Sequence, residues 1–184
     1  ERPNWFAPKG ETREDRLSFD QRECNWFTAV GEECKAVRER VALIDQSSFA
    51  KMEVSGPGAL EALNYLAAAN VDKPVGSAIY TQLCNEKGGI EADLTINRLD
   101  DDLFYVVTGS GFGVRDFHWI NTHLPSDGSV QTKEVTSAWS TLNVCGPKSR
   151  DVLAAVTDDD VSNETFPFST CRQITIGSAP VRAI

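Results

Sequence analysis

The chain has 184 residues, enough for one ordinary domain or two small ones, and its 41% hydrophobic and 24% charged residues exclude a disordered composition. Its formal net charge of −9 argues against nucleic acid and anionic membranes as partners, because both require a basic face. A small anionic ligand stays allowed, because it needs only a local cluster of donors.

The N-terminal third is predicted to form an arm followed by a helix, a strand and a second helix. Residues 1–28 lack a clear period and form an arm anchored by aromatic rings. Apolar residues then recur at steps of four, three and four from Val30 to Val41, which predicts a helix. Residues 49–55 alternate as a strand, and Gly56-Pro57 begins the second helix with proline at its first position.

The rest of the chain alternates between short strands and two further helices. The predicted strands cover residues 77–84, 89–99, 103–107, 141–145, 173–176 and 180–184. The predicted helices cover residues 114–123 and a stretch that begins after Gly146-Pro147 and ends near residue 156. Hairpin-connected strands with helices on one side predict an α+β fold with antiparallel sheets.

Two segments 90 residues apart are alike: residues 52–57 and 142–147 are each a strand that runs into Gly-Pro and a helix. This echo fits an internal duplication, but Gly-Pro before a helix is also common by itself, so both explanations stay open. The chain begins with Glu1 and ends on a strand-like alternation around Arg182. Such a strand needs a neighbour, so we expect a fragment of a larger architecture.

The glycine-rich loop at residues 109–113 lies between a strand and a helix, where dinucleotide-binding turns occur. The dinucleotide fingerprint requires a glycine at position 114, where this chain has Val114. The neighbouring strands form hairpins, and no acidic residue ends a second strand about 20 residues later. We therefore interpret the loop as a tight connection, with Ser110 near the helix start.

The cysteines and histidines form no metal or redox motif. Five cysteines lie scattered without a C-x-x-C pair, which suggests free thiols in a reducing compartment. His118 and His123 have no cysteine nearby to complete a zinc site, so we expect no metal. No signal peptide or bilayer-spanning stretch is found, and we expect a chain in the cytoplasm, or in the mitochondrial matrix of a eukaryote.

The first hairpin carries the strongest functional signal. Pairing Cys84 with Gly89 across its turn places the apolar sets of both strands on one face. The same register puts Tyr80 directly opposite Asp93 on the other face, with Cβ atoms roughly 5 Å apart. A phenol beside a carboxylate offers a surface to a flat ring and an acceptor to its N–H groups, and the carboxylate could take a proton. A merely solvated aspartate is the competing interpretation.

Five blocks stand in fixed order along the chain, at residues 45–51, 56–57, 80–85, 88–94 and 145–147. Together they resemble the glycine-cleavage aminomethyltransferase (T-protein) family. Within that family, residues 1–6 and 162–169 are most similar to the C-terminal folate-binding region of sarcosine and dimethylglycine dehydrogenases.

The resemblance implies the first part of a three-lobed architecture around a tetrahydrofolate channel. Residues 1–46 would be an arm and helix of the first lobe, residues 47–135 an α+β lobe with a folate-facing hairpin, and residues 136–184 a return to the first lobe. The next family block, Arg-x-Ser-x-x-Gly-Glu, would start just past Ile184. That block and the family segments beyond it would supply the acid and the arginine that grip the folate, so the segment is incomplete.

The resemblance also implies roles for individual residues. The catalytic aspartate of a Gly-Gly-Ile-x-Asp-Asp-Leu motif falls on Asp93, and the first aspartate of that pair is Ala92 here. The tyrosine that lines the pterin site falls on Tyr80, and an apolar site residue falls on Phe49. Thr108 stands where the aminomethyltransferases proper carry asparagine, which favours the dehydrogenase branch.

The implied parent protein is an FAD-dependent oxidoreductase that acts on the CH–NH bond of an N-methyl amine. Its flavin domain, and not this segment, would bind FAD and pass an iminium or formaldehyde to tetrahydrofolate, giving 5,10-methylenetetrahydrofolate. The segment alone is expected to lack turnover. Two alternatives stay open: a regulatory subunit of the pyruvate dehydrogenase phosphatase type, and an aminomethyltransferase that serves a lipoyl carrier without flavin.

Overall fold

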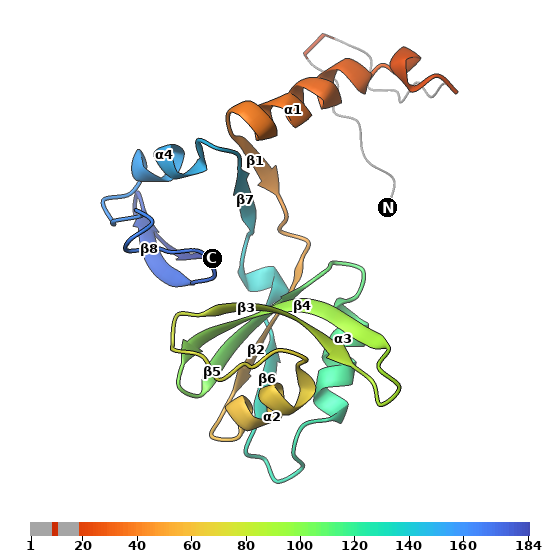
Figure 1. Ribbon diagram of the computed structural model, residues 1–184, viewed down its shortest axis with the longest axis vertical. Coiled ribbons are helices and arrows are strands. Elements are labelled where there is room, and N and C mark those ends of the chain that lie inside the picture. The colour runs from red at the N-terminus through yellow and green to blue at the C-terminus, as the bar shows by residue number, and fades with distance from the viewer. Residues whose placement is uncertain (1–8, 11–18) are drawn as a thin grey trace. The chain divides into compact units, whose positions relative to one another are not determined.

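The computed structural model describes residues 9–10 and 19–184, which group into two compact units (Figure 1). The smaller unit combines the N-terminal part up to Ile44 with Asn143–Asp151. The larger unit combines Asp45–Leu142 with Val152–Ile184. The lobe boundaries after residues 46 and 135 stay a prediction, and the dehydrogenase-like residues 1–6 lie outside the described part of the chain.

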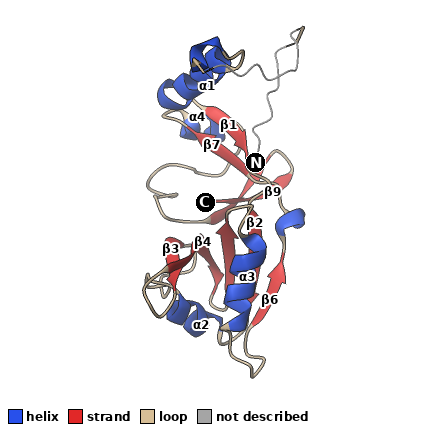
Figure 2. Cartoon of the chain, turned by 90° about the vertical axis from the view of Figure 1, so that its right-hand side faces the viewer, coloured by secondary structure: helices blue, strands red, loops and turns tan. Residues whose placement is uncertain are grey.

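The larger unit is built on a five-stranded antiparallel sheet with the order β3-β4-β5-β2-β6. Its strands are β2 (Ala50–Ser55), β3 (Ala78–Cys84), β4 (Ile90–Asp100), β5 (Leu103–Thr108) and β6 (Gln131–Glu134). Helices α2 (Ala59–Leu66) and α3 (Gly113–Thr122) pack on one face of the sheet (Figure 2). The predicted α+β class, antiparallel sheets with covering helices, is confirmed.

The hydrophobic core lies between this face and the two helices. Its fully buried members alternate along the strands with residues of the opposite face, and include Met52, Val54, Ile96, Phe104 and Val106. Each such side chain contributes roughly 1.5–3 kcal/mol on burial. One prediction about this region is wrong: α2 begins at Ala59 with Gly58 as its N-cap, so Pro57 does not take the first helical position.

The smaller unit contains helix α1 (Phe27–Glu39) and most of the pairing of β1 (Ala42–Asp45) with β7 (Leu142–Cys145). The helix α4 (Ser149–Ala154) begins in this unit and passes into the larger one at Val152. Helix α1 starts three residues earlier than the periodicity predicts and ends before Val41. Strands β1 and β6 were not predicted. Each has only four residues, and the sequence Gln-Thr-Lys-Glu of β6 shows no apolar alternation.

The two Gly-Pro segments share one backbone geometry. Gly56 and Gly146 have φ values of 116° and 131°, a region that favours glycine. A Cβ atom at Gly56 would overlap the carbonyl oxygen of Ser129, and one at Gly146 would overlap that of Arg40. In both places the residue after the proline donates its backbone N–H to that same carbonyl.

The contacted carbonyls also occupy equivalent places in the two units. Ser129 precedes β6, which pairs with β2, and Arg40 precedes β1, which pairs with β7. In each unit, therefore, a strand leads through Gly-Pro into a helix, and its partner strand comes just after the contacted carbonyl. This repeated arrangement favours internal duplication over coincidence.

A C-terminal hairpin completes the larger unit, with strands β8 (Arg172–Ile176) and β9 (Ala179–Ala183) as predicted. Arg182 of β9 fixes the hairpin to the sheet. Its Nη2 atom donates to Glu53 Oε1 at 3.0 Å, and its guanidinium lies 4.2 Å from the Trp139 ring and 4.7 Å from the Tyr105 ring. Glu53 and Tyr105 are register partners, so one side chain anchors the hairpin to two strands.

Replacing Arg182 with alanine is expected to speed amide hydrogen exchange in β8 and β9 at least about tenfold. The variant loses two cation–π contacts, each worth about 0.5–2 kcal/mol, and the ion pair with Glu53. Hydrogen–deuterium exchange of the whole protein measures the change. Arg38→Ala, at a site on α1, is the control and should leave these amides unchanged. Unaltered exchange in the Arg182 variant would contradict the anchoring role.

Candidate functional site

The sheet face opposite the two helices carries two of the predicted site residues. Tyr80 on β3 and Asp93 on β4 alternate with buried core residues and so face away from α2 and α3. The Tyr80 side chain is 67% exposed, and Asp93 is exposed as well. Neither residue is held inside the hydrophobic core, so both are available to a ligand.

The predicted pairing register is wrong by two residues. Tyr80 lies opposite Thr95, and Asp93 lies opposite Gln82. The difference arises at the hairpin end, where the turn is longer than predicted and a β-bulge leaves Glu91 of β4 without a partner on β3. A shift by two residues keeps every side chain on its predicted face, because side chains alternate with a period of two.

Tyr80 and Asp93 nevertheless meet as diagonal neighbours. The Tyr80 hydroxyl donates to Asp93 Oδ2 at 3.0 Å, and Gln82 Nε2 lies 3.5 Å from Asp93 Oδ1. The hydrogen bond to Asp93 raises the pKa of Tyr80 above its usual value, because the carboxylate stabilises the protonated phenol. The phenol therefore remains a donor at neutral pH and fixes the orientation of the carboxylate.

Phe49, the third predicted site residue, belongs to a different part of the sheet. It directly precedes β2, and β5 lies between β2 and β4 in the strand order. It is half-buried in a turn closed by its own N–H, which donates to the Gln46 carbonyl at 3.0 Å. The structure thus brings Tyr80 and Asp93 into direct contact, while Phe49 lies two strands from Asp93, beside Ala50, which is level with Leu94.

A buried lysine near Phe49 escaped the sequence analysis. Lys51 has no exposed surface, and its Nζ atom donates to the carbonyls of Ser47 at 2.9 Å and Thr136 at 3.4 Å. Burial lowers the pKa of Lys51, while the carboxylates of Glu134 and Asp45 oppose this shift. Lys51 therefore ties the turn before β2 to the segment after β6. Lys51 alternates with the core residues Ala50 and Met52, so the strand pattern by itself gives no sign of its burial.

Thr108, the position that favours the dehydrogenase branch, does not face the Tyr80–Asp93 pair. It is 2% exposed on the core side of β5, and its hydroxyl donates to Asp116 Oδ2 of α3 at 2.6 Å. The same hydroxyl oxygen lies 3.4 Å from the backbone carbonyl oxygen of Asp93. Thr108 and Asp116 therefore lie behind the candidate site, and no sequence pattern indicated Asp116.

The glycine-rich loop is a tight connection, as predicted. A Cβ atom at Gly113 would overlap the side chain of Ala50, so the start of α3 packs directly on β2. Ser110 does not cap α3; its hydroxyl donates to Ser48 Oγ at 2.8 Å. The N-cap residue is Phe112, which makes no side-chain capping bond.

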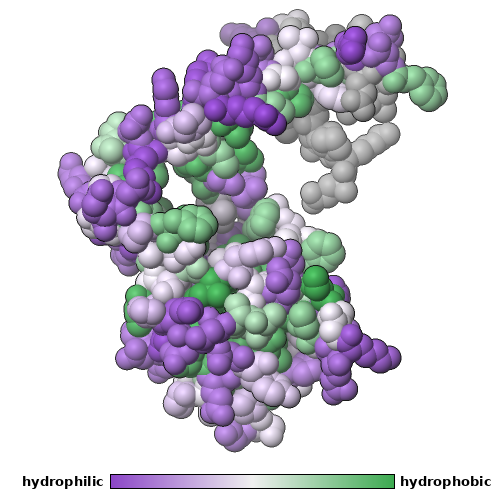
Figure 3. Space-filling model, viewed as in Figure 1, coloured by the Kyte–Doolittle hydropathy of each residue, from purple (hydrophilic) through white to green (hydrophobic). Residues whose placement is uncertain are grey.

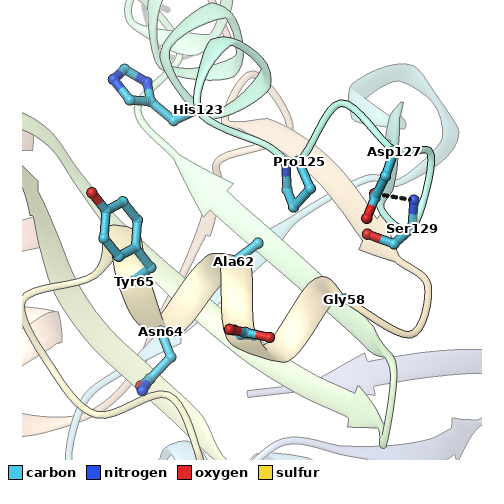
Figure 4. Close-up of a pocket in the computed structure, with 9 residues that line it drawn as sticks. Gly58, Ala62, Asn64, Tyr65, His123, Pro125, Asp127 and Ser129 are labelled. Carbon is cyan, nitrogen blue, oxygen red and sulfur yellow. Dashed lines mark hydrogen bonds between the residues drawn. The ribbon is translucent and has the colours of Figure 1, made fainter.

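A hollow of about 470 Å³ lies between α2 and the loop after α3 (Figure 4). Tyr65 and His123 lie at one end of it, and Asp127 and Ser129 at the other. Neither Tyr80 nor Asp93 contributes to its lining. This hollow belongs to the helix-covered side of the sheet and is separate from the candidate site.

Hydrophilic residues predominate on the face seen in Figure 3, in line with the acidic composition. Across residues 9–10 and 19–184, no three His, Cys, Asp or Glu side chains gather where they could hold a metal ion. Within the same described residues, no helix combines the length and apolar character needed to cross a bilayer.

Comparison with known proteins gives one family and several relatives. The family model of the GCVT N-terminal domain matches residues 1–184. Human mitochondrial dimethylglycine dehydrogenase is 35% identical over 185 residues, which cover 100% of this chain and 21% of that protein. The mitochondrial pyruvate dehydrogenase phosphatase regulatory subunit of Mus musculus is also 35% identical over 185 residues, covering 97% of this chain and 21% of that protein. The chain thus spans about a fifth of each relative.

A solved structure agrees with these relatives. The glycine cleavage system aminomethyltransferase T from Bartonella henselae superposes with a TM-score of 0.62 at 28% identity. The match covers 67% of this chain and 34% of that protein. It confirms the predicted aminomethyltransferase-like architecture.

Proposed function

Since the chain belongs to the GCVT N-terminal domain family, we propose that it is the folate-binding, one-carbon-accepting part of a flavin-dependent N-methyl amine dehydrogenase. Its substrate would be of the sarcosine or dimethylglycine type, and its product 5,10-methylenetetrahydrofolate. The observation that carries the folate site is the hydrogen-bonded Tyr80–Asp93 pair on the sheet face opposite the helices. The relationship to human dimethylglycine dehydrogenase supports the dehydrogenase assignment.

The residues of the pair fit a reduced pterin. Tyr80 exposes an aromatic face against which a flat ring can stack. Among the residues that the structure describes, Asp93 Oδ1 has only the 3.5 Å contact with Gln82, so it keeps capacity to accept N–H groups. Tetrahydrofolate, when bound, supplies the nucleophilic nitrogen that takes up the one-carbon unit. FAD would bind to the flavin domain of the same protein and not to these residues.

In this proposal the two carboxylate oxygens of Asp93 have different roles. Oδ2 stays bonded to the Tyr80 hydroxyl, whose raised pKa keeps its proton in place at neutral pH. Oδ1 is then the atom that receives the proton released as the one-carbon unit is captured. Holding the ring and the carboxylate in one arrangement would supply part of the acceleration by orientation.

A regulatory role is the second candidate, because the mouse phosphatase regulatory subunit is as identical to this chain as the human dehydrogenase is. An aminomethyltransferase serving a lipoyl carrier is the third, favoured by the Bartonella henselae structure. Because the mouse and human relatives named above are described as mitochondrial, we propose the mitochondrial matrix of a eukaryote, or otherwise the cytoplasm, as the location of this protein.

The whole protein, purified with any flavin it carries, tests the proposal. We expect it to oxidise an N-methyl amine, to release formaldehyde without folate, and to form methylenetetrahydrofolate when tetrahydrofolate is present. Absence of flavin and of amine oxidation would contradict the dehydrogenase assignment and favour the regulatory role. One-carbon transfer from a lipoyl carrier by a flavin-free protein would instead favour the aminomethyltransferase.

A further inference from the structure

Asp116 is a buried carboxylate with an incomplete set of partners. It lies in the first turn of α3 and is 2% exposed. Its Oδ2 atom accepts the Thr108 hydroxyl at 2.6 Å, while its Oδ1 atom is buried and has no hydrogen-bond partner among the described residues. A buried charge costs free energy unless its bonds are complete, so a hydrophobic residue would stabilise this site better.

The partner of Asp116 lies directly behind Asp93. Thr108 is the register partner of Leu94 on β4, the residue next to Asp93. Its hydroxyl oxygen is 2.6 Å from Asp116 Oδ2 and 3.4 Å from the Asp93 carbonyl oxygen, so the single hydroxyl proton is shared unequally between two acceptors. A contact therefore runs from α3 through β5 to the peptide of Asp93.

Arg115, the residue before Asp116 on α3, contacts β4 at Glu91, two residues before Asp93. Arg115 Nη2 donates to Glu91 Oε2 at 2.6 Å, and Glu91 Oε1 accepts from Asn85 Nδ2 at 2.7 Å. The amide of Asn85 and the guanidinium of Arg115 lower the pKa of Glu91, so the carboxylate stays ionised and paired at neutral pH. Two consecutive residues of α3 thus fix β4 at Glu91 and at Asp93.

We propose that Thr108 and Asp116 are positioning residues that set the place of the Asp93 carboxylate relative to the ring of Tyr80. This inference rests on the proposed folate site. β4 pairs with β3 on one side, where the hairpin end contains a bulge, and with β5 on the other, where the register begins at Leu94, so Asp93 lies just beyond the β4–β5 ladder. The hydroxyl–carboxylate contact behind it ties that position to the rigid helix α3.

Substitutions at Thr108 test the proposal in the whole protein. Thr108→Val removes the hydroxyl, and kcat for methylenetetrahydrofolate formation should fall about tenfold, the factor that one hydrogen bond can supply. The KM for folate should change less, because Tyr80 still offers its ring, and amine oxidation should be unchanged. Thr108→Ser keeps the hydroxyl and should stay within about twofold of the wild type.

Thr132→Val is the matched control. Thr132 is half-buried on β6 and its hydroxyl also donates to a side chain of α3, Asn121 Oδ1 at 2.5 Å, but β6 lies three strands away from β4 in the sheet. Equal losses of methylenetetrahydrofolate formation in the two valine variants would overturn the inference, because they would show a purely structural effect. Asp116→Asn combined with Thr108→Val should cost no more than Thr108→Val alone.

Failure of the inference can be told apart from failure of the proposed function. A wild-type protein that couples amine oxidation to folate, together with a fully active Thr108→Val variant, would overturn the positioning role alone. A wild-type protein that forms no methylenetetrahydrofolate would overturn both.

Discussion

Replacing Asp93 with alanine is expected to abolish methylenetetrahydrofolate formation by the whole protein, while amine oxidation continues and formaldehyde is released. The variant loses the oxygen that would receive the proton and the partner that holds the Tyr80 hydroxyl. Because positioned acids and bases contribute about 10²–10⁴-fold, the coupled rate should fall at least about a hundredfold. The motif offers no replacement, since Ala92 stands where the family carries a second aspartate. Product and free formaldehyde are measured in the same reaction.

Two further variants make this result specific. Asp93→Asn keeps the shape of the side chain but cannot take the proton, so it should show the same separation of the two activities. Asp100→Ala removes another exposed carboxylate from the same strand and should leave both activities unchanged. Equal loss of oxidation and coupling in the Asp93 variants would show that Asp93 is structural.

Replacing Gly56 with alanine is expected to lower the free energy of unfolding of the larger unit by about 3–5 kcal/mol, combining backbone strain with steric overlap. Gly56 has φ 116°, and an added Cβ would overlap the Ser129 carbonyl, which lies just before β6. Either α2 or β6 must then move. Hydrogen exchange should rise in α2 and β6 before it rises in β3 and β4.

The variant Gly88→Ala separates the cost of backbone strain from the cost of steric overlap. Gly88 also has a positive φ, 77°, but an added Cβ there would have no heavy atom within 4 Å. This variant should lose only about 1–2 kcal/mol, the cost of the left-handed conformation. Similar losses in the two variants would mean that backbone conformation, and not the close approach of Ser129, makes Gly56 necessary.

The sheet faces were predictable from the sequence, but the strand register was not. Alternating apolar residues placed Ile96 on the core side and Asp93 on the opposite side, and the structure agrees. Register depends on turn length and on the bulge at Glu91 of β4, which are backbone features that apolar alternation does not encode. The predicted contact between Tyr80 and Asp93 exists although the predicted register was wrong, because a tyrosine side chain reaches a diagonal neighbour.

The candidate site was only partly predictable for a related reason. Asp93 and Tyr80 lie on neighbouring strands, so local pairing brings them together. Lys51 was missed because its burial depends on a distant segment: its Nζ atom bonds to the carbonyl of Thr136, 85 residues away. Asp116 was missed because its burial depends on how α3 packs against the sheet. A charged residue on the polar side of a strand or in the first turn of a helix is expected to be solvated until those segments are in place.

The ends of the long segment between β1 and β7 meet each other. Gln46 donates its N–H to the Thr141 carbonyl at 2.8 Å, and β1 pairs with β7 directly beyond these residues. A loop whose two ends are clamped together can lengthen or shorten without altering the separation of its ends. Insertions or deletions in the turns of residues 47–140 should therefore leave the spacing of the β1–β7 ladder unchanged.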